Sequence, residues 1–307
     1  MKKIIILVIA SLFMFGCGKK QEKINIGITQ IIEHPALDAA TEGFKEALAD
    51  GGYTEDKVNI EVQNAQGDFG VAQTIASSFV QDKKDLILAV STPSAQSVFN
   101  VTKEIPLLIT AVTDPVAVGL VGDNITGTSD MAPIDKQIQL MKTLLPNAKR
   151  IGFLYNTSEE NSRVVLKKMK EIAEPQGFEI VEKGVTNINE VGQAIDVLLD
   201  EIDVLYTPSD NVVTASMSLI SNRAEGKNVP VITSDGAQFK AGALATEAID
   251  FKKLGYQTGE MAVRVLNGEK PSDMPIETLK DTELMINQEM AKKFNVIIPK
   301  ELKNKLN

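Results

Sequence analysis

Short apolar runs alternate along the chain with stretches of helical periodicity. The runs are rich in Ile, Val and Leu and show little alternation with polar residues, which is typical of strands buried on both faces of a sheet. Eight such runs are predicted as strands: 24–29, 58–62, 86–90, 107–112, 151–155, 179–182, 204–206 and 229–233.

Helical periodicity occurs between these runs. Residues 36–49 place Leu37, Phe44 and Leu48 on one helical face, and residues 162–173 repeat the pattern. A strict alternation of strands and helices predicts an α/β fold with parallel sheets flanked by helices.

The same arrangement occurs twice. In the first half a strand leads into Thr92-Pro93-Ser94, and a later Ile-Pro strand ends in Thr113-Asp114. In the second half a strand leads into Thr207-Pro208-Ser209-Asp210, and a Val-Pro strand ends in Ser234-Asp235-Gly236. We therefore predict two similarly built lobes, the first over 24–125 and the second beginning at 126.

The Thr-Pro-Ser turns are candidate ligand contacts. Thr can cap a helix and Pro fits its first turn, so free N–H groups remain at the helix start. In open α/β sheets ligands bind beyond the carboxyl ends of the strands, where these turns lie. Such residues often only cap their helices, and this alternative stays open. The candidates are Thr92, Ser94, Ala95, Thr113 and Asp114 in the first lobe and Asn156, Ser158, Asp210, Asn211, Asp235 and Gly236 in the second.

One difference between the two copies favours a ligand. The fourth position of the turn is Ala95 in the first lobe and Asp210 in the second. A helix start without an acidic residue suits a carboxylate ligand group. Asp210 and Asp235 suit an ammonium group, because carboxylates accept charge-assisted hydrogen bonds. A ligand with both groups is an α-amino acid.

The N-terminus has the pattern of an export signal. Lys2 and Lys3 precede an apolar run that ends at Gly16-Cys17, and Cys17 is the only cysteine. The run is too short for a membrane span, so we expect a signal peptide over 1–16, lipid on Cys17 and a polar tether over 17–23. An uncleaved anchor with an incidental cysteine is the alternative.

Composition narrows the function further. Cleavage before Cys17 would leave 30 basic against 41 acidic residues, a formal net charge of −11, which disfavours nucleic-acid binding. A single histidine excludes a histidine-rich metal site. A hydrolase using His34 would need a Gly-x-Ser-x-Gly elbow, which the sequence lacks. No nucleotide-binding glycine loop is present either, so an enzyme is disfavoured and no cofactor is expected.

Eight stretches resemble the substrate-binding lipoproteins of ABC transporters related to tryptophan and tyrosine uptake. They are 28–40 (ITQIIEHPALDAA), 63–68 (QNAQGD), 91–96 (STPSAQ), 110–116 (TAVTDPV), 124–131 (NITGTSDM), 154–162 (LYNTSEENS), 207–211 (TPSDN) and 242–246 (GALAT).

The resemblance implies a two-lobed binding protein of type I, with three crossovers between hinged lobes. It also implies an aromatic amino acid as ligand and a permease with its ATPase as partners. We expect a monomer held by its lipid at the outer face of the bacterial cytoplasmic membrane. A ligand-binding sensor or a surface adhesin on the same fold is the alternative function.

The crossovers are predicted at 124–131, 244–251 and 267–275. The first lobe then includes about 249–270, and the second includes 126–248 and about 271–307. Gln30 and His34, near the end of the first strand, are further candidate ligand contacts. His34 is expected either to contact the ligand or the opposite lobe, or only to cap a helix or lie at the surface, and both alternatives stay open. Candidates for an aromatic pocket are Phe69, Tyr155, Tyr206 and Phe239.

Overall fold

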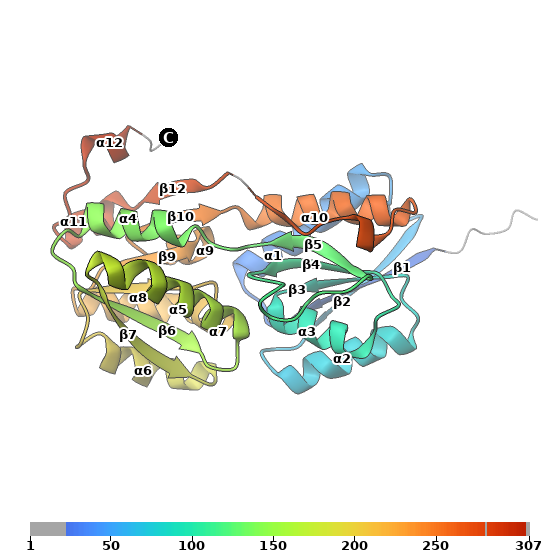
Figure 1. The fold of residues 1–307 in the computed structure, drawn as a ribbon, viewed down its shortest axis with the longest axis horizontal. Coiled ribbons are helices and arrows are strands. Elements are labelled where there is room, and N and C mark those ends of the chain that lie inside the picture. Colours follow the sequence, from blue (N-terminus) through green and yellow to red (C-terminus); the bar gives the residue numbers. More distant parts are fainter. Residues whose placement is uncertain (1–22, 280, 305–307) are drawn as a thin grey trace, which may run out of the picture.

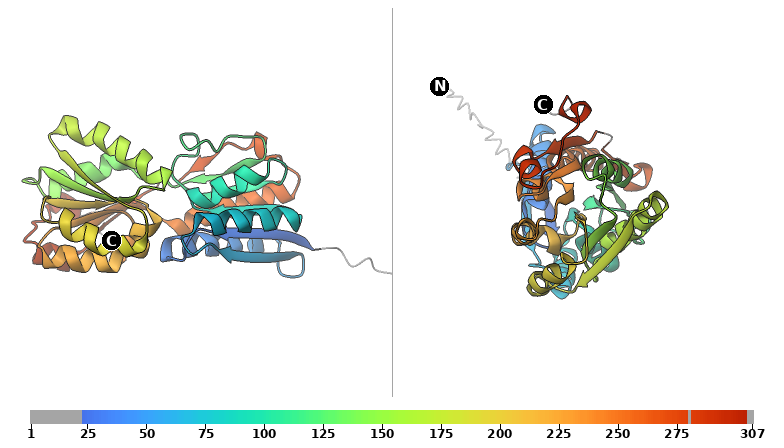
Figure 2. Two further views of the ribbon diagram at one scale, coloured as in Figure 1. Left: turned by 90° about the horizontal axis from the view of Figure 1, so that it is seen from below. Right: turned by 90° about the vertical axis from the view of Figure 1, so that its left-hand side faces the viewer.

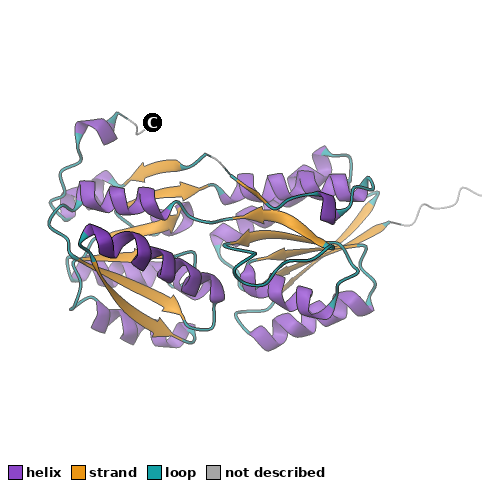
Figure 3. Cartoon of the chain, viewed as in Figure 1, coloured by secondary structure: helices purple, strands orange, loops and turns teal. Residues whose placement is uncertain are grey.

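The computed structural model describes residues 23–279 and 281–304, which form two α/β lobes lying end to end (Figure 1). Each lobe contains a six-stranded sheet, and helices cover both faces of each sheet (Figures 2 and 3). The predicted signal peptide, Cys17 and most of the tether lie outside the described residues. None of the helices within the described ranges is both long and apolar enough to cross a bilayer.

The first sheet has the strand order β11-β5-β4-β3-β1-β2, and all its strands are parallel. Helices α1 and α10 pack on one face, and α2 and α3 on the other (Figure 1). The strands are β1 (Ile24–Gln30), β2 (Val58–Asn64), β3 (Leu86–Val90), β4 (Leu107–Val112), β5 (Ile125–Ser129) and β11 (Glu277–Thr278). The helices are α1 (Pro35–Asp50), α2 (Phe69–Gln81), α3 (Thr92–Val101), α10 (Phe251–Leu266) and the short η3 (Pro271–Asp273).

The second sheet has the order β12-β10-β9-β8-β6-β7 and is parallel except for β12. Its strands are β6 (Arg150–Asn156), β7 (Glu179–Val185), β8 (Val204–Thr207), β9 (Val231–Asp235), β10 (Ala245–Ile249) and β12 (Glu283–Ile286). Its helices are α4 (Ile134–Leu144), α5 (Glu160–Ala173), η1 (Glu174–Gln176), η2 (Ile188–Glu190), α6 (Val191–Leu198), α7 (Asn211–Ala215), α8 (Met217–Gly226), α9 (Gly236–Lys240), α11 (Gln288–Lys293) and α12 (Lys300–Lys303).

The second lobe has a core on each face of its sheet. Phe153 and Tyr206 point into the core under α4 and α5, whereas their neighbours Leu154 and Leu205 point into the core under α6 and α8. Side chains of a strand alternate between faces, so a strand covered on both sides must be apolar at consecutive positions. All eight predicted strands occur in the structure, and this requirement accounts for the central ones, whereas the edge strands β2 and β7 are mostly exposed or half-buried.

Among the described residues the chain passes between the lobes three times, at 130–133, at Asp250 and between the end of β11 and the start of β12. The first two passages fall at or beside the predicted segments. The third lies later than predicted, because β11 pairs with β5 in the first sheet before the chain leaves that lobe. Similarly, β5 is a strand of the first sheet, so residues 126–129 lie in the first lobe and not in the second, where they were predicted.

Helices α1 and α10 pack unusually close together. A Cβ atom on Gly255 would overlap the backbone carbonyl of Ala40, and one on Gly43 would overlap the carbonyl of Lys252. Glycine at these positions lets the two backbones approach each other, so α10 is bound tightly to the first lobe although it comes late in the chain.

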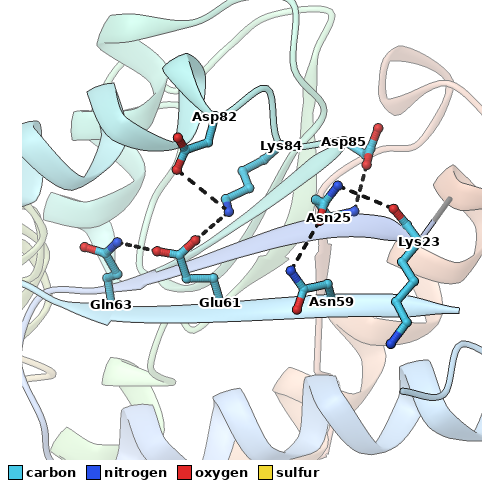
Figure 4. Close-up of polar contacts among 8 residues, drawn as sticks. All are labelled: Lys23, Asn25, Asn59, Glu61, Gln63, Asp82, Lys84 and Asp85. Atoms are coloured by element: carbon cyan, nitrogen blue, oxygen red, sulfur yellow. Dashed lines mark hydrogen bonds and ion pairs between the residues drawn. The ribbon is translucent and has the colours of Figure 1, made fainter. Parts of the chain in front are cut away.

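The amino ends of β1, β2 and β3 carry a polar cluster at the pole of the first lobe (Figure 4). The ammonium group of Lys84, whose side chain is 7% exposed, pairs with Glu61 on β2 and contacts Asp82. Asp85 accepts a hydrogen bond of 2.7 Å from the backbone N–H of Asn25. These contacts join neighbouring elements of the first lobe at the edge opposite the carboxyl ends of the strands.

Candidate functional site

A cavity lies where the carboxyl ends of the two sheets meet. Its volume is about 10 Å³, room for about one water molecule. This is far below the range of about 300–1,000 Å³ typical of small-molecule sites, so the lobes must move apart before an amino acid can enter. The lining residues are His34, Ala36, Leu37, Ala111, Asp130, Asn161, Ser209, Asp210, Asn211, Thr214, Asp235 and Phe251. A larger hollow along α4 and β12 contains none of the described buried polar atoms that lack a hydrogen bond, so the cavity between the lobes is the better candidate.

The two walls of the cavity differ in chemistry. Ala36, Leu37, Ala111 and Phe251 belong to the apolar core of the first lobe. Polar residues of the second lobe form the opposite wall, and Asp130, in the first passage between the lobes, adds a carboxylate. No lysine or arginine is among the lining residues.

Asp130 is the most unusual side chain in this cavity. It is 4% exposed, and its Oδ1 atom is buried without a hydrogen-bond partner. Burial raises its pKa to about 7, with a smaller contribution from the negative charge of Asp235 and an opposing one from the side chain of Thr113. A buried carboxylate oxygen without a partner is costly, so the position of Oδ1 favours a positively charged group. From the sequence, Asp130 is predicted only as part of a crossover.

Asp235 ends β9 and caps α9. Its Oδ1 atom accepts hydrogen bonds of 2.8 Å from the backbone N–H groups of Ala237 and Gln238. Burial raises its pKa to about 6. These bonds do not use Oδ2, so Asp235 retains an oxygen for a ligand.

Asp210, in contrast, is occupied by the protein itself. Its Oδ2 atom accepts from the backbone N–H of Asn156 and from Ser162 Oγ, both at 2.6 Å. Its Oδ1 atom accepts from the backbone N–H of Val213 at 3.0 Å and so caps α7. The second Thr-Pro-Ser turn is therefore longer than predicted, because the helix begins at Asn211 and not at Pro208.

A second buried acid lies beside Asp210. Glu159 accepts hydrogen bonds from the side-chain amides of Asn161 and Asn211, at 3.1 and 2.6 Å, and from the backbone N–H of Asn211. Burial, followed by the negative charge of Asp210, raises the pKa of Glu159 to about 8. Burial also raises the pKa of Asp210. Glu159 is not among the site residues predicted from the sequence.

His34 connects the two walls. It is 6% exposed, and its Nε2 atom lies 3.3 Å from Oδ1 of Asn211 in the opposite lobe. Of the roles considered for His34, the contact with the other lobe is therefore present, whereas the side chain neither caps α1 nor lies at the surface. His34 also lines the cavity, so its side chain is placed where it could contact a ligand.

The start of α3 differs in part from the prediction. The residue before the helix is Ser91, not Thr92 as predicted, and no side chain caps the helix. Ser91 has a φ of 90°, a strained value for a non-glycine residue. Ser91 lies between the end of β3 and the start of α3, where the chain turns from strand to helix. The N–H of Ala95 already donates to Ser91 O, which leaves the N–H groups of Thr92 and Ser94 for another acceptor.

The remaining candidates lie near the cavity or have other partners. Thr113 lies beside Asp130, whereas Asp114 forms an ion pair of 3.1 Å with Lys168 across the lobes. Gln30 bonds to Ile32, Asp38 and Thr41 within the first lobe. Of the thirteen predicted residues, only His34, Asp210, Asn211 and Asp235 line the cavity. The other nine do not: Gln30, Thr92, Ser94, Ala95, Thr113, Asp114, Asn156 next to Asp210, the exposed Ser158, and Gly236 at the start of α9.

The predicted aromatic residues do not line the cavity. Tyr206 is fully buried, donates to Gln137 Oε1 at 2.7 Å and stacks on Phe153, and Tyr155 packs against the same Phe153. Phe239 packs in the second lobe, and Phe69 is 37% exposed. The aromatic side chain that lines the cavity is Phe251, which sequence position alone could not distinguish from a core residue.

The family model for "ABC transporter substrate binding protein" matches residues 25–306. The chain belongs to this family. It is therefore a solute-binding protein and not an enzyme, as its sequence predicted, and the family acts outside the cytoplasm.

Similar proteins support this assignment. The chain is 49% identical over 286 residues to a "Tyrosine-binding protein" of Clostridioides difficile, which covers 91% of this chain and 82% of the relative. It resembles a solved structure from Streptococcus pneumoniae in complex with L-Trp, with 32% identity, a TM-score of 0.90 and coverage of 93% of this chain and 99% of the other.

A third relative shows the same fold in another state. The ligand-free, open structure of a substrate binding protein with adhesive properties from Clostridium difficile is 50% identical. It covers 90% of this chain and 96% of its own, with a TM-score of 0.68. The predicted two-lobed α/β fold of type I is confirmed by these neighbours.

Proposed function

We propose that this substrate-binding protein is the lipid-anchored receptor of an ABC importer and that it captures tyrosine or tryptophan between its lobes. The names of the relatives support an aromatic amino acid. The observation that carries the proposal in this chain is the buried Oδ1 atom of Asp130, which has no partner.

The ligand's ammonium group binds between Asp130 and Asp235. Both carboxylates are buried in a cavity without a basic lining residue, and an ammonium group donates the hydrogen bonds that their free oxygens accept. This modifies the prediction from sequence, in which Asp210 shared the ammonium with Asp235. Asp210 acts indirectly, by fixing the start of α7 and the strand end at Asn156.

The ligand's carboxylate binds at the start of α3. The helix has no side-chain cap and offers the N–H groups of Thr92 and Ser94, and the buried Oγ1 of Thr92 lacks a partner. Helix N-termini favour anions because their N–H groups and dipole point at the ligand. Thr113, beside Asp130, adds a hydroxyl to the same region.

Closure of the lobes traps the ligand. The similarity to the L-Trp complex, at 32% identity, exceeds the similarity to the ligand-free, open structure at 50% identity. Since a more identical chain should have more similar lobes, the difference in TM-score supports a closed arrangement of the lobes here. A ligand that contacts both lobes shifts the equilibrium toward this state.

The site is tested by calorimetry with the mature protein and the twenty amino acids. Asp130→Asn should weaken binding of tyrosine or tryptophan by about a hundredfold, since loss of a charge-assisted bond in a closed site costs about 2–5 kcal/mol. Asp123→Asn, the same change at an exposed position, is the control and should bind normally. Unchanged affinity in Asp130→Asn would refute the ammonium site.

The anchor is tested separately through Cys17, which follows the apolar N-terminal run. Cys17→Ser should release the protein from membranes or leave it as unprocessed precursor. A processed variant that still needs detergent for extraction would refute lipidation at this residue. The relative with adhesive properties favours a second function at the cell surface, and binding of the mature protein to host cells would test it.

A further inference from the structure

His34 is held in one orientation by its position before α1. It occupies the N-cap position, directly before Pro35 at the first turn of the helix, and its backbone carbonyl accepts from the N–H of Asp38 at 3.1 Å. Ala36 and Leu37, in the same turn, line the cavity beside it. The imidazole therefore belongs to the apolar wall of the cavity.

The hydrogen bonds of Asn211 determine which nitrogen of His34 carries the proton. Asn211 Nδ2 donates to Oε2 of Glu159 at 2.6 Å, so Oδ1 is the amide atom that faces His34. An amide oxygen only accepts hydrogen bonds, and Nε2 of His34 must therefore be the donor.

The other nitrogen, Nδ1, then carries a lone pair. Burial lowers the pKa of His34 to about 4, against smaller opposing effects of Asn211 and Asp38, so the ring is neutral at pH 7. Nδ1 is buried and has no hydrogen-bond partner. A buried acceptor without a donor is costly, and the cavity is where a donor can come from.

We propose that Nδ1 of His34 accepts a hydrogen bond from the ligand's side chain and thereby selects tyrosine or tryptophan over phenylalanine. This inference rests on the proposed amino-acid site. The ammonium group is the other candidate donor, but the carboxylates of Asp130 and Asp235 attract a cation more strongly than a neutral imidazole does. The side chain of the ligand is therefore the donor that remains for His34. When the ligand's ring packs on Leu37 and Phe251, its edge faces the apolar wall that also contains His34.

Only some aromatic side chains satisfy this acceptor. The phenol O–H of tyrosine and the indole N–H of tryptophan donate hydrogen bonds, whereas the phenylalanine ring has no donor. Sites that bond a substrate hydroxyl reject the analogue without it, because a buried polar atom loses its partner. From a cost of about 1–3 kcal/mol, phenylalanine should bind about tenfold to a hundredfold more weakly.

The experiment compares dissociation constants by calorimetry for tyrosine, tryptophan, phenylalanine and 4-fluorophenylalanine. The last ligand places fluorine where tyrosine has its hydroxyl and so fills similar space without donating. We expect the wild-type protein to bind tyrosine or tryptophan at least tenfold more tightly than both donor-free ligands. His34→Leu should reduce this preference to about twofold or less.

The ratio of affinities separates selection from closure. His34→Leu also removes the bond to Asn211, which should weaken all ligands equally and leave the ratio unchanged if His34 only joins the lobes. Glu33→Gln, an exposed change at the preceding residue, should retain the wild-type ratio.

Two outcomes would overturn the inference while the proposed function stands. One is a wild-type protein that binds phenylalanine as tightly as it binds the better of tyrosine and tryptophan, a result that does not depend on the folding of any variant. The other is an unchanged ratio in His34→Leu. Absence of binding by any amino acid would instead refute the proposed function and the inference with it.

Discussion

Asp130 and Asp235 line one cavity from different parts of the fold, and the negative charge of Asp235 contributes to the raised pKa of Asp130. Asp130 follows β5 of the first sheet, whereas Asp235 ends β9 of the second. The two acids therefore approach each other only when the lobes are together. A bound ammonium group between them would replace repulsion by attraction.

Ligand affinity should depend on pH in the window set by these acids. The pKa values are about 7 for Asp130 and about 6 for Asp235, and protons compete with the ligand's ammonium for both carboxylates. Affinity should therefore fall as pH decreases from about 7.5 to about 5, by at most about tenfold per unit for each group. Calorimetry across this range measures the effect, and Asp130→Asn should flatten it.

The stability of the ligand-free protein should change in the opposite direction. A carboxyl group with a raised pKa binds more protons in the folded than in the unfolded state, so its contribution to stability is lost as pH rises through the folded pKa. The free energy of unfolding should thus decrease between about pH 4 and pH 7 from Asp130 and Asp235. Urea titrations would contradict this if Asp130→Asn showed the same pH slope as the wild-type protein.

Asp210→Ala should destabilise the fold as well as the site. The substitution removes the cap of α7 and the acceptor for Asn156 and Ser162. We expect the free energy of unfolding to fall by about 2 kcal/mol, measured by denaturant titration without ligand. A variant as stable as the wild-type protein would show that these bonds are easily replaced.

Lys168→Met should weaken closure slightly and in a salt-dependent way. Lys168 on α5 pairs with Asp114 of the first lobe at 3.1 Å, and both side chains are partly exposed, at 39% and 24%. Such pairs contribute about 0–1 kcal/mol, so affinity should fall by at most about fivefold at low salt. The difference from the wild-type protein should vanish near 1 M NaCl, where exposed charges are screened.

Lys84→Ala should lower stability without affecting the ligand. Lys84 pairs with Glu61 far from the cavity, and its ammonium lies 5.4 Å from the centre of the Phe79 ring. We expect a loss of about 1–2 kcal/mol in unfolding free energy. Lys84→Met, which keeps the alkyl stem, should lose less, and both variants should bind amino acids normally.

The lobes could be predicted from sequence because strands buried on both faces require consecutive apolar residues. The third passage between the lobes was placed too early because the strand that precedes it contains no apolar run. β11 consists only of Glu277 and Thr278, and neither residue is buried. It belongs to the first sheet because it pairs with β5, and no local pattern in the sequence predicts that pairing.

The site was predicted in part for a similar reason. Position after a strand identified Asp235 and His34 as cavity residues, but it could not tell that Asp210 caps a helix while Asp130 lacks a partner. That distinction depends on Asn156, Ser162 and Val213, which are brought to Asp210 by folding. The orientation of His34 likewise depends on Asn211, 177 positions away in sequence.

The close packing of α1 against α10 has a consequence for biogenesis. The ribosome makes α1 within the first 50 residues, yet its glycine-lined partner ends only at Leu266. The first lobe therefore lacks one of its helices until most of the chain has been made, and contacts of such high sequence separation form slowly. Late completion of this lobe would suit the export that the N-terminal pattern predicts, because a chain threads through an export channel only before it has folded.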